Sequence, residues 1–139
     1  MPQATARPLA LIVTTREFER LHYAAAMAAA AGAIGRPVTL FFSDGALVAL
    51  TAPLADGRPG WQLLAGAAAL DARRQRLGLA DFETLLASLR ELGGRFLACE
   101  AGLRAMGLGL ADLRADLGLA GGGLASLMLE MAEAQLVYV

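Results

Sequence analysis

"DFETLLASLRELGGRFLACEAGLRAMG", residues 81–107, is the stretch of sequence that decides the fold. Its first half predicts a helix, because Asp81 can cap the N-terminus and apolar side chains recur at helical spacing before two glycines, namely Phe82, Leu85, Leu86, Leu89 and Leu92. The run "RFLAC" (95–99) predicts a buried strand, and "EAGLRAMG" (100–107) predicts a short helix. Such an order is typical of domains in which strands and helices alternate.

The first third of the chain repeats this alternation. "LALIV" (9–13) and "VTLFF" (38–42) are short apolar runs that predict strands buried on both faces, as in a parallel sheet. Residues 14–35 between them predict a helix, which Thr14 or Thr15 can cap and Gly35 can end. Its buried face is expected to hold Phe18, Leu21, Ala25 and Ala28.

After residue 107 the expected elements are weaker. "LADLRAD" (110–116) predicts a short helix and "LGLAG" (117–121) a weak fourth strand. "GGLASLMLEMAEA" (122–134) predicts the last long helix, and "LVYV" (136–139) a closing strand. The inward side chains of that helix are expected to be Leu124, Leu127, Met128 and Met131. We therefore expect one α/β domain over residues 1–139, with a mainly parallel sheet and helices on both of its faces.

The stretch from 52 to 79 is the least regular part of the chain. It contains several prolines and glycines and then the basic cluster "ARRQR". A loop of this length inside a compact domain is usually functional or disordered. We expect part of it to be mobile, and its arginines to form a solvated face: Arg73, Arg74 and Arg76.

Composition excludes several classes of function. The net charge of −1 gives no global field to attract nucleic acid or an anionic membrane, and the uncharged stretch 21–35 is too short to span a bilayer. One cysteine and one histidine exclude an internal disulfide and argue against a metal site. The sequence therefore predicts a soluble, cytoplasmic protein, and its apolar fraction of 57% predicts a subunit interface.

Cys99 is the main candidate for chemistry. It lies at the expected end of a strand and the start of a helix, where unpaired N–H groups and the helix dipole stabilise a thiolate. Glu100 beside it disfavours a second negative charge, and Arg104, four residues later, can pair with Glu100 and soften that effect. The alternative is that Cys99 is an inert core residue, since free cysteine is among the most buried residue types.

Other candidates carry weaker signals. The turn Ser43–Asp44–Gly45 follows the second strand, at the sheet edge where α/β domains bind ligands, but Asp44 is more typical of a turn than of an acid or base. His22 reads as a packed helix residue rather than a catalytic group. "GLAGGG" (118–123) precedes a helix, yet it lacks both the dinucleotide-binding spacing and the lysine of a phosphate-binding loop.

Taken together, these segments resemble the DsrE/DsrF-like family, and most closely its DsrE2-type sulfur-relay branch. The resemblance rests on "LALIVTT", "VTLFFSDG" and the stretch from "FETLLASLRELGGRFLACEAGLRAMGL" through "LADLRADLGLAGGGLASLMLEMAEAQLVYV", and it leaves residues 52–79 poorly matched. It implies a three-layer α/β/α Rossmann-like fold with a five-stranded, mainly parallel sheet. The chain departs from the family where Glu100 replaces a small polar residue and where the turn in "FFSDG" lacks the aromatic residue often seen there.

The resemblance also implies a function. In sulfur-relay members the cysteine after the third strand carries sulfur as a persulfide, and Cys99 matches that position. Such proteins form homo- or hetero-oligomers, commonly trimers or hexamers, exchange sulfur with donor and acceptor proteins, and need no cofactor or metal. Two alternatives remain: a small-molecule-binding or assembly protein with an inert Cys99, and a redox enzyme working through a sulfenic acid, which would lack a resolving cysteine.

Overall fold

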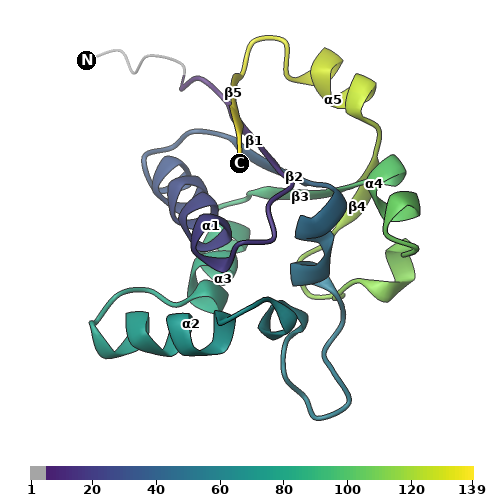
Figure 1. Cartoon of the computed structure of the whole chain (residues 1–139). Coiled ribbons are helices and arrows are strands. Elements are labelled where there is room, and N and C mark those ends of the chain that lie inside the picture. The colour runs from purple at the N-terminus through teal and green to yellow at the C-terminus, as the bar shows by residue number, and fades with distance from the viewer. Residues whose placement is uncertain (1–5) are drawn as a thin grey trace.

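A five-stranded parallel sheet forms the centre of the molecule in the computed structural model, which describes residues 6–139 (Figure 1). The strands follow the order β4-β3-β2-β1-β5, and every neighbouring pair is parallel. Their bounds are β1 Leu9–Val13, β2 Val38–Phe42, β3 Arg95–Cys99, β4 Ala120–Gly122 and β5 Gln135–Tyr138. The expected bounds of the first three strands are confirmed, and β4 and β5 lie within three residues of the expected positions.

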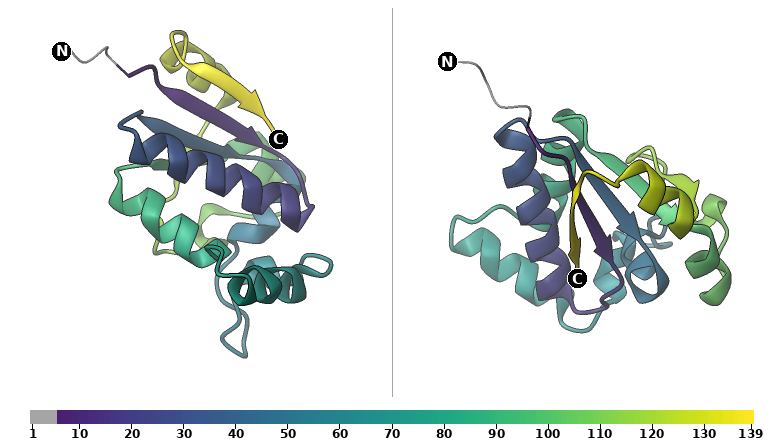
Figure 2. Two further views of the ribbon diagram at one scale, coloured as in Figure 1. Left: turned by 90° about the vertical axis from the view of Figure 1, so that its left-hand side faces the viewer. Right: turned by 90° about the horizontal axis from the view of Figure 1, so that it is seen from above.

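Helices cover both faces of the sheet, which gives three layers. The α-helices are α1 Phe18–Ala33, α2 Ala67–Arg76, α3 Phe82–Glu91, α4 Glu100–Ala105 and α5 Leu124–Glu130. The 3-10 helices are η1 Asp44–Leu50, η2 Gly60–Leu63 and η3 Leu110–Asp112. Figure 2 shows α1 and α3 on one side of the sheet and α5 on the other. The fold is thus a three-layer α/β/α, Rossmann-like domain, and none of its helices within residues 6–139 has the length and apolar character needed to cross a bilayer.

The two faces of the sheet carry cores of very different size. Strand residues alternate between the faces, so Leu9, Leu11 and Val13 enter a large core with α1 and α3. The face under α5 holds a small cluster of buried residues: Phe41, Leu97, Cys99 and Leu127. Cys99 therefore lies on the thinly covered face of the sheet.

The start of α1 differs from expectation. The helix begins at Phe18 with Glu17 as its N-cap residue, so neither Thr14 nor Thr15 caps it. The two hydroxyls are engaged elsewhere, because Thr15 Oγ1 accepts the N–H of Glu17 at 3.1 Å and Thr14 Oγ1 lies 2.7 Å from the hydroxyl of Tyr138. Gly35 follows the helix at φ 87°, as its predicted role as a helix stop requires, and the expected buried face is confirmed.

The C-terminal helix is shorter than expected. α5 ends at Glu130, and Leu124 and Met128 are 51% and 48% exposed, so the prediction that they face inward is wrong. The prediction is confirmed for the other two residues, since Leu127 is buried and Met131, which follows the helix, packs against the same small core. Likewise, the helix expected at 110–116 is the single turn η3, after which Leu113 forms a bridge with Thr51.

Residues 52–79 are more regular than predicted, since they contain η2 and α2. The Trp61 ring stacks on Phe18, with centroids 5.2 Å apart, and meets Phe82 edge-on at 5.7 Å. The buried carboxylate of Asp71 accepts the N–H of Phe82 at 2.9 Å, which joins α2 to the start of α3. The prediction of one long loop is therefore wrong for this part. Arg73 and Arg76 are exposed and Arg74 is partly exposed, in line with the expected solvated face.

Candidate functional site

The carboxyl ends of β2 and β3 meet at one edge of the sheet and bring most of the predicted site residues together. Gly102, in α4, lies directly against the turn that follows β2, because a Cβ atom on Gly102 would lie 2.8 Å from the backbone nitrogen of Asp44 and would also meet Ser43. The missing side chain thus lets the helix that follows Cys99 pack on the Ser43–Asp44 turn. The juxtaposition expected from the two sequence segments is present.

The turn itself is built by local contacts. Asp44 adopts φ 51°, a left-handed conformation that Asp tolerates better than most residues, and Ser43 Oγ donates to its carboxylate at 3.2 Å. Gly45 is buried beneath the side chain of Arg16. These roles are structural, as the turn interpretation of Asp44 predicted.

Arg16 is a residue of this edge that sequence reasoning missed. It follows β1, covers Gly45, and directs its Nη2 atom to the sulfur of Met106 at 3.6 Å. It therefore spans the ends of β1 and β2 and the far end of α4. Its position three residues after the end of a buried strand was the available signal.

Cys99 ends β3 and serves as the N-cap residue of α4. Its backbone is extended (φ −65°, ψ 121°), and its Sγ atom accepts the N–H of Gly102 at 3.4 Å. The predicted junction of strand and helix is therefore present. The residue is only 6% exposed and packs among Phe41, Leu97 and Leu127, so the expectation that its sulfur faces an open cleft is wrong.

A cavity of about 320 Å³ lies next to this buried thiol. It is lined by Arg95, Leu97, Glu100, Gly121, Gly122, Gly123, Ser126, Leu127 and Glu130. Its two leucines, Leu97 and Leu127, belong to the same small core as Cys99. The cavity therefore reaches the side chains that cover the sulfur, and two carboxylates and one guanidinium line its polar part.

Glu100 and Arg104 do not form the expected pair. Within residues 6–139, the ion pairs and side-chain hydrogen bonds include none between them. Glu100 is exposed and its carboxylate lies over Gly121, where a Cβ atom would be 3.3 Å from Oε1. The charge of Glu100 is thus not offset by Arg104.

His22 is a packed core residue, as predicted. Its Nε2 atom lies 2.9 Å from the carbonyl oxygen of Ala80, which ties α1 to the residue before Asp81. Its Nδ1 atom is buried and has no hydrogen-bond partner within the described part of the chain. The position is remote in the fold from Cys99, because His22 packs on the α3 side of the sheet beside Phe18.

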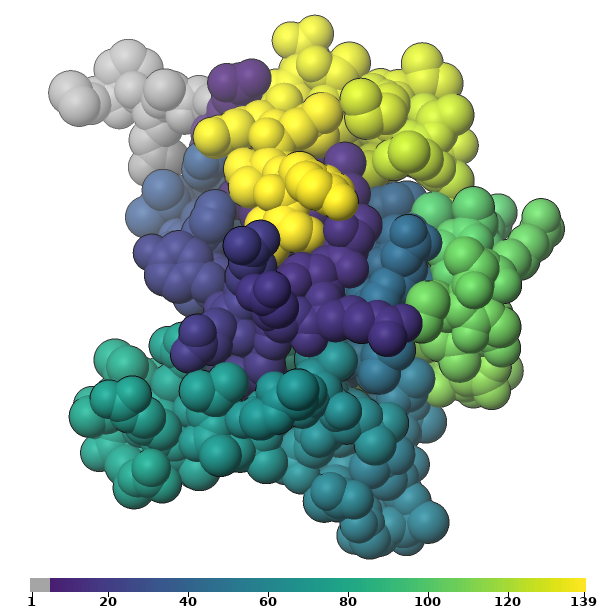
Figure 3. Space-filling model, in the orientation of Figure 1, coloured from purple at the N-terminus to yellow at the C-terminus, as the bar shows by residue number. Residues whose placement is uncertain are grey.

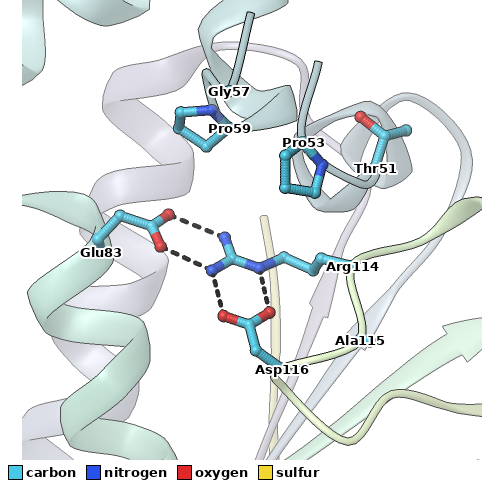
Figure 4. A pocket seen from close by; sticks show the side chains of 8 residues that line it. All are labelled: Thr51, Pro53, Gly57, Pro59, Glu83, Arg114, Ala115 and Asp116. Atoms are coloured by element: carbon cyan, nitrogen blue, oxygen red, sulfur yellow. Dashed lines mark hydrogen bonds and ion pairs between the residues drawn. The ribbon is translucent and has the colours of Figure 1, made fainter. Parts of the chain in front are cut away.

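A second, larger cavity of about 530 Å³ was not predicted from the sequence (Figure 4). Its floor is the guanidinium of Arg114, which binds Glu83 through Nη1 at 2.8 Å and Nη2 at 2.6 Å, and binds Asp116 through Nε and Nη2 at 2.7 Å each. Proline and glycine residues of the 51–59 segment form its walls. The only signal in the sequence was the arginine and aspartate in "LRAD".

The charges around Arg114 stabilise one another. Hydrogen bonds from Arg114 lower the pKa of Asp116, and hydrogen bonds to Asp116 and then Glu83 raise the pKa of Arg114. Trp61 Nε1 adds a further donor to Glu83 at 2.8 Å. With four of its N–H groups engaged, Arg114 is a structural cation that holds the 113–116 segment against α3.

Among the described residues, Cys99 is the side chain best suited to act as a nucleophile, since it is the one thiol and its sulfur meets a backbone donor. Groups of three or more metal-binding side chains are not found within residues 6–139. The arrangement is therefore suited to thiol chemistry, provided that the thiol becomes accessible.

Comparison with known proteins supports the fold. The solved structure of a protein of unknown function, MTH1491 from Methanobacterium thermoautotrophicum, is similar with a TM-score of 0.65. The similarity covers 96% of this chain and 99% of that chain, at 12% sequence identity. Likeness at this level of identity shows the shared fold alone. No family model and no curated protein matches the chain.

Proposed function

We propose that this protein is a sulfur carrier of the DsrE-like type, which accepts and passes sulfane sulfur through Cys99. The observation that carries the proposal is the hydrogen bond from the Gly102 N–H to Cys99 Sγ at the carboxyl edge of the sheet. A backbone N–H aimed at sulfur stabilises a thiolate and, equally, the terminal charge of a persulfide next to it. The resemblance of the sequence around Cys99 to sulfur-relay proteins supports the same function.

The chemistry needs two thiol-exchange steps and no oxidant. The Cys99 thiolate attacks the outer sulfur of a donor persulfide, R–S–SH; a new S–S bond forms at Cys99 and the donor leaves as R–S⁻. An acceptor thiolate then attacks the outer sulfur of the Cys99 persulfide, and the Cys99 thiolate is regenerated. The donor and acceptor are proteins or small persulfides, and neither step requires a cofactor or a metal.

The carrier works as a homo-oligomer in this proposal, as a trimer or a hexamer. Support comes from apolar side chains that α5 and β5 leave exposed: Leu124, Met128, Leu129, Leu136 and Tyr138. Figure 3 shows α5 and β5 as adjoining yellow surface at one edge of the molecule. Monomeric proteins rarely expose large contiguous apolar patches, and such patches commonly mark sites of interaction with another protein.

The second candidate function is a small-molecule-binding or assembly protein in which Cys99 is inert. Two observations favour it: Cys99 is only 6% exposed, and the larger cavity shares no lining residue with the small core around Cys99. In that case the fold provides binding surface alone, and no sulfur is transferred.

Intact-mass spectrometry after incubation with inorganic polysulfide separates the two candidates. The wild-type protein is expected to gain the mass of one sulfur atom, which dithiothreitol then removes, whereas Cys99→Ala gains none. The same protein unfolded in urea provides the control, because its thiol is fully accessible. If the unfolded thiol loads and the native one never does, the carrier proposal is wrong and the binding protein takes its place.

A further inference from the structure

The helix α5 is attached to the sheet next to the candidate thiol by very few contacts. Leu127 is 2% exposed and is the buried residue of this helix, whereas Leu129, two positions later, is 81% exposed. Leu127 packs in the small core with Phe41, Leu97 and Cys99. Leu127 therefore both anchors the helix and covers the sulfur, and the only further side chain from this end of the described chain that packs on the cluster is Met131, the residue after the helix.

The ends of α5 offer little additional support. The helix has seven residues, fewer than an isolated helix needs to be stable in water, and its N-cap residue Gly123 supplies no side-chain acceptor. Gly121 and Gly122 are the last two residues of β4 and pair with Ala98 and Cys99, so the hinge is the end of this strand and Gly123, where a glycine backbone can absorb large changes of φ and ψ. At the other end, the ion pair between Arg95 and Glu130 has an N–O distance of 3.4 Å and is half-exposed at both partners, so it adds little stability.

The cavity beside the thiol shows where access would open. It runs between β3, the glycines at the end of β4 and α5, and Leu127 forms part of its wall. Because Leu97 and Leu127 both line the cavity and pack with Cys99, outward movement of Leu127 would join the cavity to the sulfur. The rest of the sheet need not move, since the large core lies on its opposite face.

We infer that α5 is a lid: it opens by local unfolding about Gly122–Gly123, at the end of β4, withdraws Leu127 and exposes Cys99. This inference rests on the proposed sulfur-carrier function for its biological meaning, because the lid would control when the thiol meets a donor or acceptor. Local opening of this kind occurs in elements that bury few apolar side chains. The closed state described here is then the protected state of the carrier.

Two variants should change the opening of α5 in opposite directions. The measurement is the rate at which iodoacetamide alkylates Cys99 in the native protein. Leu127→Ala removes the anchor and is expected to raise the rate about tenfold or more. Gly122→Ala stiffens the hinge, and its Cβ atom would meet Phe41 and Leu97 at the ordinary distances of 3.8 and 3.9 Å. It is expected to slow alkylation about two- to fivefold.

Matched controls test whether the effect belongs to the lid. Leu77→Ala changes an exposed leucine at the end of α2 and should leave the rate unchanged, as should Gly109→Ala, whose Cβ atom would meet only Asp112 Oδ2 at 3.6 Å. The wild-type rate should also respond only weakly to low urea concentrations, because a local opening exposes little surface. Equal rates in all variants, or a rate that follows global unfolding in urea, would overturn the lid.

The outcome for the lid is separable from that for the carrier. A protein in which Leu127→Ala alkylates faster, but in which no variant gains sulfur from polysulfide, has the lid without the carrier function. A protein that gains sulfur at Cys99 with the same rate in every variant is a carrier without a lid. Hydrogen exchange of the α5 amides provides a second readout, and Gly122→Ala should slow it as well.

Discussion

The backbone N–H of Gly102 donates to the Sγ atom of Cys99 at 3.4 Å, while the Cα atom of the same glycine packs against the turn at Asp44. One residue therefore sets the position of the thiol relative to two strand ends. The contact has no room for a side chain, because a Cβ atom on Gly102 would lie 2.8 Å from Asp44 N and 3.1 Å from Ser43 Cα. Both of these atoms are backbone and cannot rotate away.

Gly102→Ala should therefore destabilise the protein, although the substitution normally favours a helix by about 1 kcal/mol. We expect the clash to outweigh that gain and the free energy of unfolding in urea to fall by about 1–3 kcal/mol. Gly109→Ala is the control, since its Cβ atom would meet only Asp112 Oδ2 at 3.6 Å. A Gly102→Ala protein as stable as the wild type would show that α4 does not need this close approach.

The N-cap of α3 should make stability depend on pH. Asp81 Oδ1 accepts the N–H of Thr84 at 2.8 Å, and Oδ2 accepts from Gln75 at 2.8 Å. Hydrogen bonds from Thr84 lower the pKa of Asp81 below the model-peptide value of 3.8. The stabilisation by the charged carboxylate is therefore fully present above about pH 4 and is lost as the pH falls through the lowered pKa.

Asp81→Asn should abolish this part of the acid sensitivity, because an amide caps the helix without titrating. Urea unfolding between pH 7 and pH 2 should show that the difference in free energy of unfolding between the wild type and Asp81→Asn becomes smaller in acid. The change should be less than about 1 kcal/mol, because the carboxylate is partly solvated. Asp81→Ala, which loses the cap altogether, should cost about 1 kcal/mol at neutral pH. Identical pH profiles for wild type and Asp81→Asn would contradict the argument.

The sequence predicted the fold best where burial alone determines structure. β1, β2 and β3 are apolar runs buried on both faces, and the sequence pattern located their ends to the residue. α3 was equally clear, because a capping aspartate, an amphipathic repeat and two glycines agree. The junction that places Cys99 at the N-cap of α4 follows from those two elements.

Features that depend on contacts between distant segments could not be predicted. In the sequence, Trp61 lies in an irregular segment, and only the folded chain brings it against Phe18 and Phe82. In the same way, the sequence does not show that Arg114 binds Glu83 of α3. The burial of Cys99 depends on Leu127, which is 28 positions further along the chain. Helical spacing showed an apolar stripe on the last helix but not that only Leu127 and Met131 would pack against the sheet, with Leu124 and Met128 exposed.

Self-association should depend on the exposed apolar face of α5. Leu129→Glu places a charge at the most exposed of these leucines, and burying it in an interface would require its desolvation. We expect light scattering to show an oligomer for the wild type at micromolar concentration and a smaller species for the variant. Leu77→Glu is the control, because Leu77 is also exposed but lies at the end of α2.

A wild-type protein that is monomeric at this concentration would contradict the proposed oligomer. An oligomer that survives Leu129→Glu would instead move the interface away from α5. In that case β5 would be the next surface to test, since Leu136 and Tyr138 are exposed on the edge strand.

The negative charge of Glu100 beside the thiol should slow the loading of sulfur at Cys99. Glu100 follows Cys99 directly, and Arg104 does not pair with it among the contacts of residues 6–139, so its carboxylate is free to repel a thiolate. Glu100 is exposed, and a charge–charge interaction screened by water is worth on the order of 1 kcal/mol, which corresponds to about a fivefold change in rate. Glu100→Gln should therefore gain sulfur from polysulfide about two- to fivefold faster than the wild type at neutral pH and low salt.

Two control variants make this result specific. Glu130→Gln removes another carboxylate from the same cavity without touching the residue next to Cys99, and it tests how far the effect extends. Arg104→Gln should leave the rate nearly unchanged, because Arg104 is exposed and does not offset Glu100. Added salt should reduce the advantage of Glu100→Gln, since screening weakens the repulsion. If Glu100→Gln loads no faster than the wild type while Leu127→Ala does, then access to the sulfur, and not local charge, limits the reaction.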